Sequence, residues 1–245
     1  MIKKLFCACI YLYQGSAVRN LQDHTVVDND AARLAAYYCN NNADRIIVFD
    51  QSNTDEEHEL ALDTIKKIAI ACEVPVIGAG NVKRMEDVKK LLYAGCAKAV
   101  LNYSKESNIE ITEEVSQKFG KSKILVSYTD TGSLEAHKDL LKEYVSELIC
   151  LDKNQVKNNT GIPTICSLEK ATPEEAKEIL LTDHVSGLTG NVINDTIEDT
   201  FSQKISLAKE GVLVSACEAA MKWSDFKLNS EQMLPVIVQD YKTNE

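Results

Sequence analysis

The sequence lacks clusters of basic residues and has few histidines, and both shortages exclude kinds of partner. Its 245 residues hold 27 Lys and Arg against 37 Asp and Glu, a formal charge of −10, and the basic residues are scattered. Such a field repels polyanions, so we expect no nucleic-acid partner. A small phosphorylated metabolite is still allowed, because backbone N–H groups bind an anion whatever the net charge. No spacing typical of a site links the four histidines, which we expect on the surface: His24, His58, His137 and His184.

Paired-cysteine motifs are also absent, although the chain has eight cysteines. Only Cys7 and Cys9 lie close together, and no Cys-x-x-Cys or His-x-x-x-His pattern accompanies them. This spacing is not that of a zinc site. We therefore expect no metal and no other cofactor, and we expect free, buried thiols in a reducing cytoplasm.

No run of the sequence approaches the roughly 18 to 20 apolar residues that a membrane span needs. The opening stretch, MIKKLFCACIYLY, has the basic start and apolar middle of a signal peptide. Only Gln14-Gly15-Ser16 follows it, without a small-residue cleavage site. Its length is that of a buried strand. We expect a soluble protein with no membrane partner.

Apolar runs alternate with amphipathic stretches along most of the chain. The expected strands are Leu5–Leu12, Arg45–Asp50, Val74–Gly78, Ala97–Leu101, Lys123–Ser127, Glu147–Leu151, Pro163–Ser167 and Val185–Leu188. The expected helices are Asn29–Asn41, Glu56–Cys72, Met85–Ala94, Thr112–Phe119, Leu134–Tyr144, Pro173–Leu181 and Thr196–Lys209. Several strands are unbroken apolar stretches such as IIVF, which is typical of strands covered on both faces.

Eight strands with a helix after nearly every one favour an α/β fold, a (β/α)8 TIM barrel, over an open sheet. One connection breaks the pattern, because Lys153–Ile162 (KNQVKNNTGI) is too short and too polar for a packed helix. We therefore predict that the sixth helix is missing or very short. Strands left uncovered there would expose apolar surface as a docking face for a fused domain or a second copy, and we expect a homodimer.

Three stretches of the sequence carry a family resemblance. They are the opening strand, Ala43–Ser52 (ADRIIVFDQS) and Met85–Asn102 (MEDVKKLLYAGCAKAVLN). They resemble the histidine-biosynthesis barrels, which are the cyclase subunit of imidazole glycerol phosphate synthase and phosphoribosylformimino-aminoimidazole-carboxamide ribotide isomerase. The resemblance implies a barrel of the ribulose-phosphate-binding type, which we expect over residues 1–218.

The tail of the chain resembles a different enzyme. Phe226–Glu245 (FKLNSEQMLPVIVQDYKTNE) is similar to the first strands of phosphoribosyl-AMP cyclohydrolase, another histidine-pathway enzyme. We expect residues 219–245 to be a linker and the first strand of such a domain, in the stretch LPVIVQDY. A strand without a neighbour cannot satisfy its backbone groups. We therefore expect a longer fused protein, in which a pyrophosphohydrolase domain could also follow.

The resemblance also implies where proton transfer takes place. Family members use two aspartates, at the ends of the first and fifth strands, as general acid and base on opposite sides of the barrel mouth. In this chain those positions read Tyr11 and Thr129, with Asp130 one residue later. A phenol with a pKa near 10 is a poor base at neutral pH. We therefore expect a barrel that is inactive or much impaired in the family reactions.

Two other carboxylates follow strands, Asp50 after the second and Asp152 after the sixth. A solvated or loop-capping aspartate is the simpler interpretation of each, but Asp50 matches an aspartate that the family also carries. Asp50 and Asp130 are therefore the candidate catalytic residues. With them, the barrel would be an active sugar-phosphate isomerase or an imidazole glycerol phosphate cyclase or lyase. Without them, it would be a noncatalytic module for assembly, solubility or metabolite sensing.

The resemblance further implies a bisphosphorylated substrate held at two ends by glycine-rich turns and short helices. In the first half the turn reads Ala79-Gly80-Asn81, Asn102 is in register, and Tyr103 replaces a small hydroxyl residue. In the second half the family's Ser-Gly-Gly reads Ser167-Leu168-Glu169, which brings a negative charge to the phosphate position, while Gly190-Asn191-Val192 still suits an anion. The candidate phosphate-binding residues are Gly80, Asn81, Asn102, Ser167, Gly190 and Asn191. Turns that only connect strand to helix are the alternative.

Overall fold

The computed structural model describes residues 2–216 and 223–236. Contacts divide the chain into two units, Met1–Ser215 and Ala216–Glu245. The boundary expected after residue 218 lies outside the described residues and stays a prediction.

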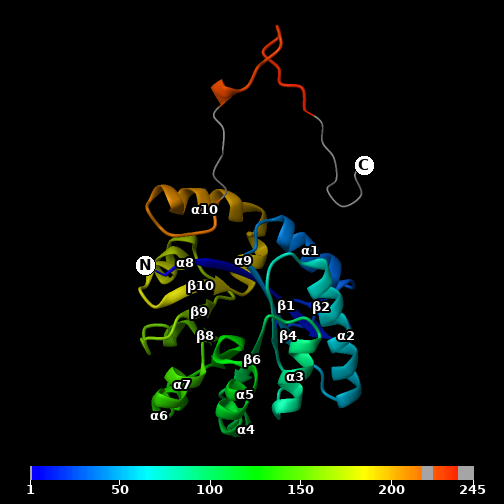
Figure 1. Cartoon of the computed structure of the whole chain (residues 1–245), viewed down its shortest axis with the longest axis vertical. Coiled ribbons are helices and arrows are strands. Elements are labelled where there is room, and N and C mark those ends of the chain that lie inside the picture. The colour runs from blue at the N-terminus through cyan, green and yellow to red at the C-terminus, as the bar shows by residue number, and fades with distance from the viewer. Residues whose placement is uncertain (1, 217–222, 237–245) are drawn as a thin grey trace. The chain divides into compact units, whose positions relative to one another are not determined.

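Eight parallel strands close into a barrel in the first unit (Figure 1). They are β1 (Leu5–Tyr13), β4 (Arg45–Asp50), β5 (Val76–Ala79), β6 (Lys98–Asn102), β7 (Ile124–Tyr128), β8 (Glu147–Cys150), β9 (Thr164–Ser167) and β10 (Val185–Thr189). Each pairs with the next, and β10 pairs with β1 to close the ring. The predicted (β/α)8 barrel is confirmed, and all eight expected strands are present within a residue or two of their expected bounds.

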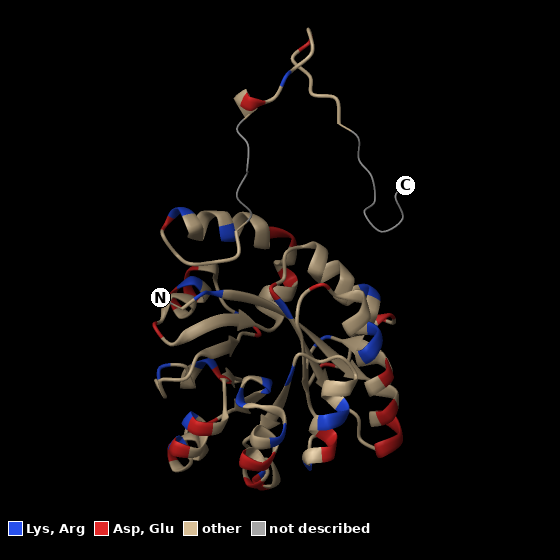
Figure 2. Cartoon of the chain, in the orientation of Figure 1, with Lys and Arg blue, Asp and Glu red and all other residues tan. Residues whose placement is uncertain are grey.

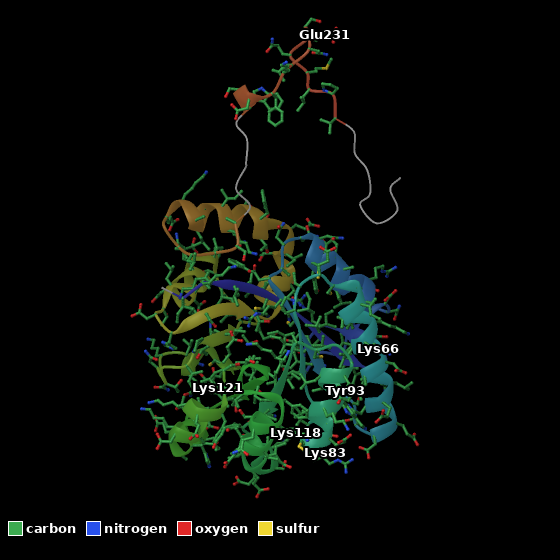
Figure 3. All side chains as sticks on the ribbon, viewed as in Figure 1. Lys66, Lys83, Tyr93, Lys118, Lys121 and Glu231 are labelled. Carbon is green, nitrogen blue, oxygen red and sulfur yellow. The ribbon has the colours of Figure 1, made fainter. Side chains whose placement is uncertain are left out.

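Helices surround the strands in Figure 1. They include α1 (Ala31–Asn40), α2 (Asp55–Ala71), α3 (Met85–Tyr93), α5 (Thr112–Phe119), α8 (Pro173–Leu181) and α10 (Thr200–Lys209). The helix expected over Leu134–Tyr144 is interrupted at His137 and forms α6 (Gly132–Ala136) and α7 (Lys138–Tyr144). Most Lys, Arg, Asp and Glu residues lie on the helices and loops (Figure 2), and exposed ones such as Lys66 are labelled in Figure 3.

Four short elements of the structure were not predicted from the sequence. The loop after β1 forms a small antiparallel extension from β2 (Ser16–Val18) and β3 (Val26–Asp28). Two helices of one turn, α4 (Glu106–Glu110) and α9 (Asn191–Asp195), follow β6 and β10. All four lie after the carboxyl ends of strands, where the loops of this fold form binding sites.

In most of the strands, alternate residues belong to two separate cores, as the period of a β-strand requires. On β4, Ile47 and Phe49 belong to the inner core that fills the barrel, whereas Ile46 and Val48 pack under the helices. On β1, Tyr11 belongs to the inner core. The same alternation turns Asp50, the residue after Phe49, towards the helices.

The sixth helix is missing, as predicted: the connection after β8 holds only the 3-10 turn η2 (Lys153–Gln155). The expected apolar docking face does not exist, however. Val156 and Ile162 are buried in the same core as Leu148 and Cys150 of β8. A loop can cover a strand when two apolar side chains point inward, so this connection replaces the helix. The homodimer stays a prediction.

An ion network lies at the amino-terminal end of the barrel. Glu147 Oε2 accepts hydrogen bonds from Arg45 at 2.7 Å and from Lys98 at 2.6 Å. Burial alone would raise the pKa of Glu147, but the two cations outweigh it and hold that pKa below its usual value. The three charges come from β4, β6 and β8, which are not adjacent in the sheet, and they lie at the end opposite the candidate site.

The second unit is described over residues 223–236. A 3-10 turn, η4 (Trp223–Asp225), brings the Trp223 and Phe226 rings to 6.0 Å between centroids. Leu234, Pro235 and Val236 are not in a strand, and the rest of the expected strand lies outside the described residues. Among the residues that are described, no helix has the length and apolarity to cross a membrane.

Candidate functional site

A cavity of about 220 Å³ opens at the carboxyl ends of β4 to β7. Its lining combines apolar residues of the inner core with polar residues of the loops: Leu21, Phe49, Asp50, Ala79, Gly80, Asn81, Val82, Val100, Asn102, Lys105, Asn108, Ser127 and Leu151. The three candidate phosphate residues of the first half, Gly80, Asn81 and Asn102, therefore meet at one cavity. We refer to this region as the first side of the mouth.

The turn after β5 has a backbone that only glycine fits at its first position. Gly80 has a φ of +95°, and a Cβ added there would lie 2.1 Å from the carbonyl oxygen of Asp50. Asn81 is also left-handed, at a φ of +52°, and its Nδ2 donates to the carbonyl of Ser52 at 3.0 Å. The turn is thus fixed against the end of β4, where its backbone can approach a ligand closely.

Asn102 is held in place by its neighbours on the loop after β6. Its backbone N–H donates to Asn108 Oδ1 at 2.9 Å, and its own Oδ1 accepts from the backbone of Ser104 at 2.9 Å. Tyr103, which replaces a small residue of the family, does not obstruct the cavity, because its hydroxyl is buried at 3.0 Å from Thr112 Oγ1. Lys105 lines the cavity, is exposed, and forms no side-chain ion pair within the described part of the chain.

The second side of the mouth holds Tyr11, Glu169 and Asn191, which we call the Glu169 network. Tyr11 Oη donates to Glu169 Oε1 at 3.1 Å, and Asn191 Nδ2 donates to Glu169 Oε2 at 2.6 Å. Both carboxylate oxygens are therefore occupied. The negative charge of Glu169 was expected from the sequence, but its two hydrogen-bond donors, Tyr11 and Asn191, were not.

Gly190 and Ser167, the other candidates of the second half, lie next to the Glu169 network along the chain. Gly190 has a φ of +94°, and a Cβ there would lie 2.6 Å from the carbonyl oxygen of Leu168. Ser167 is buried at the end of β9. The structure thus brings Gly190 and Asn191 beside the strand that precedes Glu169.

Tyr11 lies in the inner core and donates to Glu169. Its ring stacks on Phe49 with centroids 5.2 Å apart. Burial in the inner core, together with Cys9 and the Glu169 carboxylate, raises the pKa of Tyr11 above its ordinary value. The phenol is therefore neutral and acts as a hydrogen-bond donor.

The side chain of Asp50 is fully buried, although the residue lines the cavity. Its Oδ2 lies 2.5 Å from Nδ1 of His58 on α2, and its Oδ1 accepts from the N–H and Oγ of Ser52. Burial alone would raise the pKa of Asp50, but hydrogen bonds from His58, Ser52 and Asn81 outweigh it and hold that pKa below its usual value. The carboxylate fastens α2 to the end of β4.

Asp130 and Thr129 are exposed after β7. Asp130 Oδ1 accepts from the backbone of Gly132 at 2.9 Å at the start of α6, and Thr129 Oγ1 lies 3.4 Å from Ser104 Oγ. Asp152 caps η2 by accepting from the backbone of Asn154 at 3.0 Å. The structure does not bring Asp50 and Asp130 together, since each carboxylate is bound by its own loop or helix.

The expectation of surface histidines is wrong for two of the four. His58 is buried against Asp50, and His184 is buried with Nε2 at 2.6 Å from the carbonyl of Val156. His24 is exposed and His137 is half-buried. A signal for His58 was present in the sequence, because it precedes Ala61, Leu62 and Ile65 at the three-, four- and seven-residue spacing of one helix face.

In the described part of the chain, no group of three or more His, Cys, Asp or Glu side chains could hold a metal ion. The described cysteines are free: Cys7, Cys9, Cys96, Cys150 and Cys166 are buried, and Cys39 and Cys72 are half-buried.

Comparison with known proteins agrees with this geometry. The chain matches the family described as histidine biosynthesis protein over residues 6–187. Imidazole glycerol phosphate synthase subunit HisF of Staphylococcus saprophyticus subsp. saprophyticus is 26% identical over 249 residues, covering 86% of this chain and 98% of the relative. The subunit of the same name from Staphylococcus aureus strain JH9 is 31% identical over 128 residues, covering 52% of this chain and 51% of the relative.

Proposed function

The chain belongs to the histidine biosynthesis protein family, and we propose that its barrel binds a phosphorylated ribose metabolite of that pathway without converting it. The observation that carries this proposal is the state of the catalytic positions. Tyr11 is a neutral donor, Thr129 has no acidic group, and the buried carboxylate of Asp50 is bound to His58. General acid and base contribute about 10²- to 10⁴-fold each, so loss of both leaves little turnover.

Binding is supported by the first side of the mouth. Its cavity of about 220 Å³ combines the Gly80 turn, the amide of Asn102 and Lys105, whose ammonium group has no ion-pair partner among the described residues. An ammonium group and nearby amides are suited to phosphate oxygens. The apolar part of the lining, such as Val100 and Leu151, suits a ring or a ribose carbon face.

The same proposal extends to a larger protein. The similarity of Phe226–Glu245 to the start of phosphoribosyl-AMP cyclohydrolase supports a fusion in which the barrel is the metabolite-binding module of a histidine-pathway hydrolase. The free thiols support a reducing cytoplasm as the location. In such a fusion the barrel serves as a sensor or as a wall beside the active domain.

The test is a calorimetric titration of the whole chain with aminoimidazole-carboxamide ribotide. A parallel absorbance assay follows turnover of the bisphosphorylated intermediate by the same preparation. We expect heat of binding and no turnover. Turnover would instead favour the active isomerase or cyclase, and absence of heat from a folded sample would leave a scaffold.

A matched pair of variants assigns the heat to the mouth. Lys105→Gln removes the charge at the cavity, whereas Lys118→Gln removes an equal charge from an exposed position on α5 (Figure 3). The heat should decrease in the first variant and persist in the second. Equal heats would show binding elsewhere on the protein.

A further inference from the structure

We propose that the Glu169 network is a built-in substitute for a second phosphate, so that the mouth binds one phosphate of its ligand and gains no affinity from a second. This inference rests on the proposed function, since it defines the class of ligand for the same mouth.

The side-chain hydrogen-bond donors of Tyr11 and Asn191 on the second side are already bound to Glu169. An anion bound on the second side would need the donors that face it, and Tyr11 Oη and Asn191 Nδ2 are already given to Glu169 at 3.1 and 2.6 Å. The carboxylate belongs to the chain, so it occupies these donors without the entropy cost of bringing in a ligand. A phosphate would have to displace it.

Charge also disfavours a phosphate on the second side. A phosphate near Glu169 would meet a like charge. Arg19 shares a neighbouring cavity with Asn191, but its two terminal nitrogens are bound to Asp195 at 2.6 and 2.5 Å. Lys105, on the first side, has no such partner within the described residues. The two sides therefore differ in the sign of the charge that they offer.

Tyr11 and Glu169, which both depart from the family pattern, form a single unit. An aspartate at position 11 would bring a like charge to the same side of the mouth as Glu169 and is too short to bind it, whereas the Tyr11 phenol reaches Glu169 and donates to it. Glutamate at 169 and tyrosine at 11 therefore suit each other. Tyr11 thus has a structural reason to be present that is separate from the loss of the base.

The experiment compares one-phosphate and two-phosphate ligands on the whole chain. Calorimetry gives Kd for aminoimidazole-carboxamide ribotide and for the bisphosphorylated intermediate, with the unmodified chain and with Glu169→Gln. We expect the unmodified chain to bind the bisphosphate no more than about twofold tighter than the monophosphate. In Glu169→Gln the bisphosphate should bind at least tenfold tighter than before, while the monophosphate Kd stays unchanged.

Two control variants separate the possible causes. Glu178→Gln removes one negative charge from α8, outside the mouth, and should leave both constants unchanged. Tyr11→Phe removes one donor but keeps the Glu169 charge, so it should not improve bisphosphate binding. A gain in either control equal to that of Glu169→Gln would overturn the proposal, because neither control removes the charge at 169.

The outcomes also separate this inference from the proposed function. A bisphosphate that binds the unmodified chain more than about twofold tighter than the monophosphate overturns the inference and leaves the proposed function intact. A gain of less than tenfold in Glu169→Gln overturns it in the same way. A monophosphate that fails to bind the folded chain overturns the proposed function, and the inference falls with it.

Discussion

The two sides of the barrel mouth share one backbone geometry but differ in the side chains beside it. Gly80 and Gly190 have φ values of +95° and +94°. A Cβ at Gly80 would meet the carbonyl of Asp50, and a Cβ at Gly190 would meet that of Leu168, each at the end of the preceding strand. On the first side this turn borders the cavity lined by Lys105, which forms no ion pair within the described residues. On the second side it borders a carboxylate that is already bound.

This contrast shows which property of a site is retained by packing and which by chemistry. The glycine turns are fixed by contacts inside the barrel, so they persist whether or not a ligand is present. Only the side chains that point into the mouth decide what binds there. A glycine-rich turn at the end of a strand is therefore evidence of the fold before it is evidence of a phosphate.

The largest effect should come from removing the shared turn. Gly80→Ala combines strain at a positive φ with a 2.1 Å clash, and should lower the free energy of unfolding by about 3 kcal/mol or more. Gly190→Ala, with a contact of 2.6 Å, should cost about as much. Urea denaturation measures both. Gly120→Ala is the control for backbone strain without a clash, since Gly120 has a φ of +93° and nothing within 4 Å, and should cost less, about 1 to 2 kcal/mol.

The next effect concerns the support behind the first side. Asp50→Asn replaces the charged acceptor of His58 and Ser52, and should lower the free energy of unfolding by about 2 kcal/mol. Asp130→Asn, which changes an exposed carboxylate at a loop, is the matched control and should have a much smaller effect. Equal losses would contradict the role of Asp50 as a buried fastening.

The pH dependence of stability gives an independent test of Asp50. Its pKa is lower in the folded protein than in the unfolded chain, where it is about 3.9. Its contribution is therefore present above about pH 4 and is lost as the pH falls through the folded pKa. Acid titration of the free energy of unfolding should fall more steeply below about pH 4 for the unmodified chain than for Asp50→Asn.

A smaller effect should distinguish the two sides by their charge. Lys105→Gln should weaken monophosphate binding about tenfold, equivalent to about 1.4 kcal/mol, without changing stability. Increasing salt should reduce the affinity of the unmodified chain more than that of the variant, because screening acts on the lost charge. An affinity that is indifferent to both changes would place the phosphate away from the cavity.

The smallest effect should be that of Tyr11→Phe on stability. The ring stacking on Phe49 is kept, and only the hydrogen bond to an exposed carboxylate is lost. We expect a decrease in the free energy of unfolding of about 1 kcal/mol or less, measured by urea denaturation. In the Glu169→Gln background the decrease should be smaller still, and a decrease of equal size would show that the pair does not interact.

The strands and the missing helix could be predicted from the sequence because they depend on local patterns. Unbroken apolar runs mark β4 and β7, and the polar stretch after β8 has no helical face. The direction of Asp50 could not be assigned in the same way. Strands of a closed barrel are apolar on both faces, so the pattern does not tell the inner face from the outer one.

The Glu169 network was beyond the reach of pattern analysis for another reason. Tyr11, Glu169 and Asn191 come from three strand ends and meet only when the barrel closes. The sequence predicted a charge at 169, but not the donors that bind it. The bound Asp50 was missed similarly, because its partner His58 looked like one more polar residue of a charged helix.

The loop that replaces the sixth helix has a practical consequence for handling this protein. Val156 and Ile162 are buried, whereas Asn158 and Asn159 between them are exposed. A peptide tag or a fluorophore attachment site inserted after Asn158 would lengthen a loop instead of dividing a helix, at a small cost in chain entropy. Because η2 precedes this loop directly at the end of β8, such a label would report on the rim of the barrel.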